Sequence, residues 1–141
     1  MFLDFYNALF SPNKILNVTK KTFFIPIIIA ILFIFSPIIL KNPTFIVIGR
    51  INISKLKLIL FILFFSYLSA GIRNLFSENN FFYSYISTIS PLVLGLLGKF
   101  FLYIAICWIL ILRLYIDLKS KNYISMIIGL IFDAFLIFWL I

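Results

Sequence analysis

Asp133 is the residue whose type and position most strongly indicate chemistry. It lies in the middle of an otherwise uncharged, apolar run over 122–141. An ionisable group at such a place is costly to expose to lipid, so it usually faces a bundle interior or a functional site. Ser125 and Gly129 precede it at helical spacing. The three residues therefore predict a small, polar helix-packing stripe that another helix can approach closely.

Helix geometry indicates which groups could meet Asp133. If the runs on either side of the 117–122 connector form an antiparallel pair, Asp133 lies ~16 Å from that connector at ~1.5 Å per residue. Cys107 would lie at the same height and Tyr103 about one turn deeper. Lys99 lies deeper still and would have to reach back.

Two interpretations of Asp133 follow. In the first, Asp133 titrates within a proton or cation relay. In the second, it is a protonated structural carboxyl that hydrogen-bonds a Tyr or Ser inside the bundle. Because a relay needs several polar groups in series and only one deep carboxylate is expected, we favour the structural carboxyl.

Other charged residues are expected nearer to helix ends. Arg113 and Asp117 are four residues apart, which predicts an exposed ion pair on one helix face, worth little stability. A second face of small and polar residues suits packing against a neighbouring helix. It comprises Ser66, Ser69, Ala70 and Arg73.

The sequence lacks the residues of most catalytic and metal sites. It has no His, one Cys, one Glu and three Asp. Zinc and iron sites need clusters of such ligands, and a hydrolytic triad needs a base beside its nucleophile. We therefore expect a protein that is not an enzyme, with no catalytic residue, metal or cofactor. Cys107, beside Trp108, is expected to be a buried packing residue.

The composition is that of an integral membrane protein. Of 141 residues, 65% are hydrophobic and 11% charged, against the usual ~45–50% and ~25%. Mean hydropathy is +1.22. A soluble domain of this size could not cover so much apolar surface with so few charges.

We expect an all-α, polytopic membrane helix bundle that forms a single domain over 1–141. An amphipathic and basic leader over 1–21 should precede five spans, the first of which is close to the ~20 residues that cross a bilayer. The spans are expected at about 22–40, 56–73, 82–97, 100–117 and 122–141. In the leader, Ser11 followed by Pro12 predicts a helix start with a capping hydroxyl. In the connector, the β-branched run Thr44 to Ile48 could be extended.

The stretch from Phe81 to Leu118 leaves the number of spans open. It is apolar throughout except for Lys99. In one interpretation, a tight turn at Gly98 and Lys99 joins two helices. In the other, one long helix from about Ser90 carries Lys99 inside the membrane and reduces the spans to four. We favour two helices, because burying a Lys costs ~2.5–3.5 kcal/mol on insertion scales.

Twelve Lys and Arg against four acids give a net charge of +8. Because the bases lie between apolar runs, we expect them to contact anionic lipid headgroups rather than nucleic acid. Other membrane subunits or further copies of the chain are the expected protein partners. With five spans, seven bases against five weakly favour a cytoplasmic N-terminus. The membrane is expected to be a bacterial inner membrane or an organellar one.

The opening segment Leu9 to Leu16, with Lys20, Lys21 and a Pro-containing first span, resembles that of prokaryotic Yip-domain membrane proteins. Trp108 and the polar connector before the last span fit as well. The resemblance implies a five-helix membrane fold and no activity, and no functional residue carries over. The chain is shorter over 81–108 than is usual in that family. The Asp-Leu-Tyr-Gly motif of the eukaryotic branch is absent, so Rab-type GTPase binding is not implied.

These observations favour a scaffold or membrane-organising subunit that works through helix–helix contacts. One alternative is an accessory subunit of a larger respiratory or ATP-synthase type complex, which should be unstable when expressed alone. The other is a small transporter or channel subunit that uses Asp133. Asp133→Asn should abolish transport, whereas a scaffold should tolerate the change because the amide can still hydrogen-bond.

Overall fold

The computed structural model describes residues 2–36, 45–48 and 51–141. Two strands and several short helices occupy the N-terminal part of the chain. In order these are α1 (Phe2–Phe10), α2 (Pro12–Ile15), the 3-10 helix η1 (Lys20–Phe24), α3 (Ile25–Ile34), β1 (Phe45–Ile48) and β2 (Ile51–Ser54).

The remaining elements are helical. They are α5 (Lys55–Leu63), the π-helix η2 (Phe64–Leu68), α6 (Ser69–Leu75), α7 (Phe82–Ser87), the 3-10 helix η3 (Ser90–Leu97), α8 (Lys99–Ser120) and α9 (Tyr123–Leu140). Because α5, η2 and α6 follow one another without a break, they form one rod.

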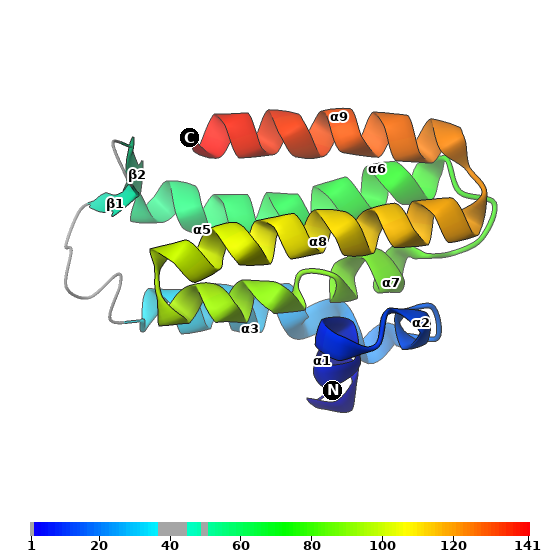
Figure 1. Cartoon of the computed structure of the whole chain (residues 1–141), viewed down its shortest axis with the longest axis horizontal. Helices are drawn as coiled ribbons and strands as arrows, with labels where there is room; N and C mark the ends of the chain where they lie inside the picture. The colour runs from blue at the N-terminus through cyan, green and yellow to red at the C-terminus, as the bar shows by residue number, and fades with distance from the viewer. Residues whose placement is uncertain (1, 37–44, 49–50) are drawn as a thin grey trace.

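The rods lie side by side and alternate in direction (Figure 1). The order along the chain is α3, then α5–η2–α6, then α7–η3, then α8 and α9. The connectors at 76–81 and 121–122 lie at the same end of the bundle, close to α2. This up-and-down arrangement brings residues far apart in sequence to the same height.

Within the part of the chain that the structure describes, three helices are long and apolar enough to cross a membrane. They are Leu56–Leu75, Phe100–Ser120 and Tyr123–Leu140, which correspond to the second, fourth and fifth expected spans. The segment Phe82–Leu97 is a shorter apolar helix. Of the expected first span over 22–40, residues 22–34 are helical and residues 37–40 lie outside the described part.

The stretch around Lys99 forms two antiparallel elements, so the single long helix is wrong. Gly98 separates η3 from α8 with φ 158°, a backbone conformation that L side chains rarely adopt. Lys99 is the first residue of α8. The absence of a Cβ at Gly98 therefore allows the reversal.

Two local predictions in the N-terminal part have mixed outcomes. The helix α2 begins at Pro12 as expected, but the Ser11 side chain makes no capping hydrogen bond. The expected extended run appears as β1 over Phe45–Ile48, paired antiparallel with β2. Thr44 lies outside the described residues.

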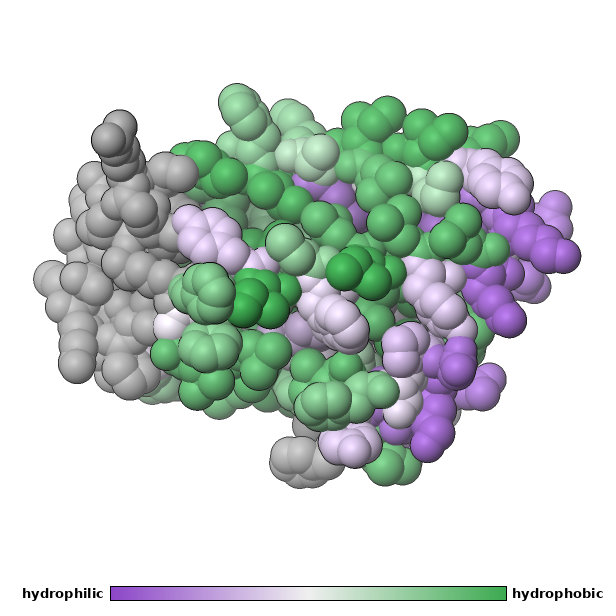
Figure 2. All heavy atoms as spheres, in the orientation of Figure 1, coloured by the Kyte–Doolittle hydropathy of each residue, from purple (hydrophilic) through white to green (hydrophobic). Residues whose placement is uncertain are grey.

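The larger core cluster lies between the long helices and is made of aliphatic and aromatic side chains. It includes Ile29, Phe33, Phe61, Phe65, Ile89, Ala105 and Ile109. Apolar side chains also cover most of the visible outer surface, and hydrophilic residues gather at the end that carries α2 and the two connectors (Figure 2). An apolar exterior of this kind suits a lipid environment.

Candidate functional site: a buried network of charged side chains

A polar network lies inside the bundle, in a region that is otherwise apolar. All of its side chains are at most 1% exposed. It consists of Ser69 and Arg73 from α6, Tyr85 from α7, Thr88 just after α7, Arg113 and Asp117 from α8, and Asp133 from α9. We call these residues the charge network. Four helices therefore contribute to one site.

Asp133 holds both arginines. Its Oδ1 accepts hydrogen bonds from Arg113 Nη1, at 2.8 Å, and from the hydroxyl of Ser69. Its Oδ2 lies 2.7 Å from Arg73 Nη2 in an ion pair. One carboxylate thus ties α9 to α6 and to α8.

Arg73 joins the two carboxylates. Its Nε lies 3.2 Å from Asp117 Oδ2, while its Nη2 faces Asp133. Its Nη1 donates to Ser69 Oγ at 2.6 Å. Because all three guanidinium nitrogens meet a polar partner, its charge is compensated inside the apolar core.

Arg113 is held by a side chain and by backbone. Its Nε donates to Thr88 Oγ1 at 3.1 Å, and its Nη2 donates to the carbonyl of Phe65 at 2.5 Å. The Phe65 ring also lies 4.3 Å from the guanidinium carbon, a cation–π contact. Phe65 belongs to the π-helical turn η2, and such turns often occur at functional sites.

Asp117 has a second partner on a fourth helix. The hydroxyl of Tyr85 donates to its Oδ1 at 2.7 Å, and Arg73 occupies its Oδ2. The Arg73 guanidinium also lies 5.8 Å from the Tyr85 ring. Tyr85 therefore links α7 to the charges on α6 and α8.

Small residues on α9 make room for Arg73. A Cβ at Gly129 would lie 2.5 Å from both Cζ and Nε of Arg73, closer than any normal contact. Ser125 is completely buried and donates its hydroxyl to the backbone carbonyl of Arg73 at 2.8 Å. The stripe of Ser125, Gly129 and Asp133 thus faces α6, with Arg73 packed along it.

The network carries no net charge, since two arginines meet two aspartates. Removing one partner of a buried ion pair leaves an uncompensated charge and costs about 3–5 kcal/mol. Replacing a whole pair with apolar residues often costs little. The network therefore specifies which helices pack together. The loss of one charged partner should cost more stability than the replacement of a whole pair.

The other sequence candidates lie away from the network. Tyr103 is 48% exposed, and Cys107 is exposed as well, so the prediction of a buried Cys107 is wrong. Lys99 begins α8, 14 residues before Arg113, which is about 21 Å along a helix. The structure places Asp133 with Arg73 and Arg113 instead.

The expected exposed pair of Arg113 and Asp117 is also wrong. Both side chains are buried, and each pairs with a residue from another helix. A single buried carboxylate is also wrong, because Asp117 is buried as well and is joined to Asp133 through Arg73. The expected Tyr or Ser partner of Asp133 is found in Ser69, and its carboxyl group also faces the guanidinium groups of Arg73 and Arg113.

Sequence reasoning missed Arg73, Arg113 and Asp117 as members of the site because charges near helix ends usually face headgroups. A signal was present, since Arg73 lies one helical turn after Ser69 on a face of small residues whose members are all buried. A charge on a packing face must find its partner inside the bundle.

No group of three or more potential metal ligands occurs among the residues that the structure describes. Comparison with protein families, with curated proteins and with solved structures finds no match.

Proposed function

We propose that the chain is a polytopic membrane protein without enzymatic activity that acts as a scaffold or membrane-organising subunit. The observation that carries this proposal is the closed charge network. Two arginines and two aspartates from three helices neutralise one another at no more than 1% exposure. Such a network supports a fixed helix arrangement that presents a constant apolar surface.

We also propose five passes through the bilayer, with α3 and α7–η3 as the two shorter ones. The alternating direction of the rods supports this topology. The same alternation supports the Yip-like five-helix fold that the opening segment suggests. Since Arg73 and Arg113 are buried, they no longer count as interfacial charges. The bases are then balanced at five on each side, and charge alone favours neither orientation.

Three pockets lined by described residues lie outside the network. None of their lining residues belongs to it. Transport through Asp133 would need a route for ions or protons to reach that carboxylate. The complete burial of Asp133 therefore supports the scaffold over the transporter or channel subunit.

Flux measurements in proteoliposomes test this proposal. The purified protein should give proton and cation flux equal to that of empty liposomes under an imposed potential. Flux above that background would overturn the scaffold and favour the transporter or channel. Wild-type flux is the sharper readout, because Asp133→Asn would leave an extra positive charge inside the bundle and would not be tolerated as an isosteric change.

The accessory-subunit alternative is supported by the large apolar side chains along α9, among them Phe138 at 81% and Ile131 at 66% exposure. A subunit that needs a partner should be degraded when produced alone and rescued by its complex. Pulse–chase measurement of its lifetime in cells distinguishes the two. A scaffold that is complete in itself should persist when expressed alone.

A further inference from the structure

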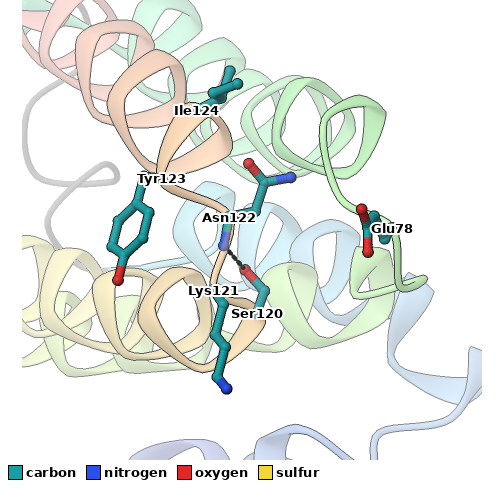
Figure 3. A pocket seen from close by; sticks show the side chains of 6 residues that line it. All are labelled: Glu78, Ser120, Lys121, Asn122, Tyr123 and Ile124. Carbon is teal, nitrogen blue, oxygen red and sulfur yellow. Dashed lines mark hydrogen bonds between the residues drawn. The ribbon is translucent and has the colours of Figure 1, made fainter.

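A polar pocket of about 500 Å³ opens at the hydrophilic end of the bundle, where α6 ends and α9 begins. Its lining residues are Glu78, Ser120, Lys121, Asn122, Tyr123 and Ile124. Glu78 lies on the loop after α6, across from the connector between α8 and α9 (Figure 3). The Lys121 side chain extends away from Glu78. None of the ion pairs among the described residues joins these two charges.

An apolar groove of about 310 Å³ lies farther along the same two helices. It is lined by Ile72, Ile128, Ile131, Phe132 and Phe135. Ile124 of the polar pocket, Ile128, Ile131 and Phe135 recur every three or four residues, which places them on one face of α9. The polar pocket and the groove therefore both lie along the seam between α6 and α9.

The length of this seam matches one membrane leaflet. From Ile124 to Phe135 the helix rises about 16 Å at ~1.5 Å per residue. Half of a hydrocarbon core of ~30 Å is about 15 Å. A polar pocket at the headgroup level and an apolar groove of one-leaflet depth together have the shape of a glycerophospholipid.

We propose that the α6–α9 seam binds one membrane glycerophospholipid whose headgroup carries both a primary amine and a phosphate. Glu78 accepts hydrogen bonds from the ammonium group, and Lys121 pairs with the phosphate. One acyl chain lies in the groove beside Ile128 and Phe132. The pocket offers one acid and one base, so its charge complements a zwitterion better than an anionic headgroup.

The test is a comparison of three lipids with identical acyl chains, added to the purified full-length protein in detergent and measured by native mass spectrometry. Phosphatidylethanolamine should bind about tenfold more tightly than phosphatidylcholine, because a quaternary ammonium cannot donate to Glu78. It should also bind more tightly than phosphatidylglycerol, which has no amine. Glu78→Gln should remove the preference over phosphatidylcholine.

Two further variants separate the groove from the rest of the surface. Ile128→Trp should fill the groove and weaken all three lipids. Its matched control is Ala134→Trp, in the pocket between α8 and α9 that Leu110 and Leu130 also line, and it should change nothing. Free phosphoethanolamine should bind more weakly than the lipid, because it lacks the acyl chains.

Several outcomes would overturn the proposal. Equal binding of phosphatidylethanolamine and phosphatidylcholine would do so, as would a preference that survives in Glu78→Gln. Tightest binding of phosphatidylglycerol would show an anionic-lipid site instead. Equally tight phosphoethanolamine would show a soluble ligand. The proposal rests on the membrane assignment above, but its failure leaves the scaffold proposal intact, since flux tests the latter.

Discussion

Gly129 sets how closely α9 can approach Arg73. Gly129→Ala should lower the free energy of unfolding by about 1–3 kcal/mol, the usual cost of overpacking, because the new methyl group overlaps the Arg73 guanidinium. The measurement is thermal or denaturant unfolding in detergent. Gly71→Ala is the matched control, since a Cβ at Gly71 meets nothing within 4 Å. Equal effects of the two substitutions would contradict a specific role for Gly129.

Tyr85 contributes one hydrogen bond to a charged partner. Tyr85→Phe keeps the ring but removes the donor to Asp117, so we expect a loss of about 1.5–3 kcal/mol of stability. Tyr103→Phe is the control, because Tyr103 is half exposed on the outer face of α8. If the two changes cost the same, the Tyr85 hydroxyl is not part of the network's stabilisation.

At the scale of the elements, the turn at Gly98 fixes the direction of α8. Single cysteines at positions 78, 99 and 120, placed in a Cys107→Ser background, test that direction. We expect a membrane-impermeant thiol reagent to label positions 78 and 120 from one side and position 99 from the other. Labelling of all three from the same side would contradict the up-and-down arrangement.

The long helices and their packing faces could largely be predicted from the sequence. Apolar length alone predicted spans at about 56–73, 100–117 and 122–141, close to the helices Leu56–Leu75, Phe100–Ser120 and Tyr123–Leu140. The small residues Ser125 and Gly129, one helical turn apart, indicated the packing face of α9. The turn could be favoured because a buried Lys99 is costly. The partners of Asp133 could not be found in this way, since they depend on which helices become neighbours. In addition, a long arginine side chain can reach a partner whose backbone lies at a different height along the bundle axis, so a count of helical rise per residue does not predict the contact.

Over the whole molecule, we expect stability to depend on the charge balance of the network rather than on any one charge. A single substitution leaves net charge inside an apolar bundle, while a compensating pair leaves none. The large cost should therefore appear in single variants and shrink in the neutral double variant. An exposed charge such as Lys119 should be replaceable with little effect.

A double-mutant cycle on Arg113 and Asp133 measures whether charge balance stabilises the network. The free energy of unfolding should be measured for the wild type, Arg113→Gln, Asp133→Asn and the double variant, with Lys119→Gln as the control. Each single change should cost about 3–5 kcal/mol, and the double change should cost less than their sum by about 1–3 kcal/mol. Strictly additive costs, or singles no worse than Lys119→Gln, would contradict the account.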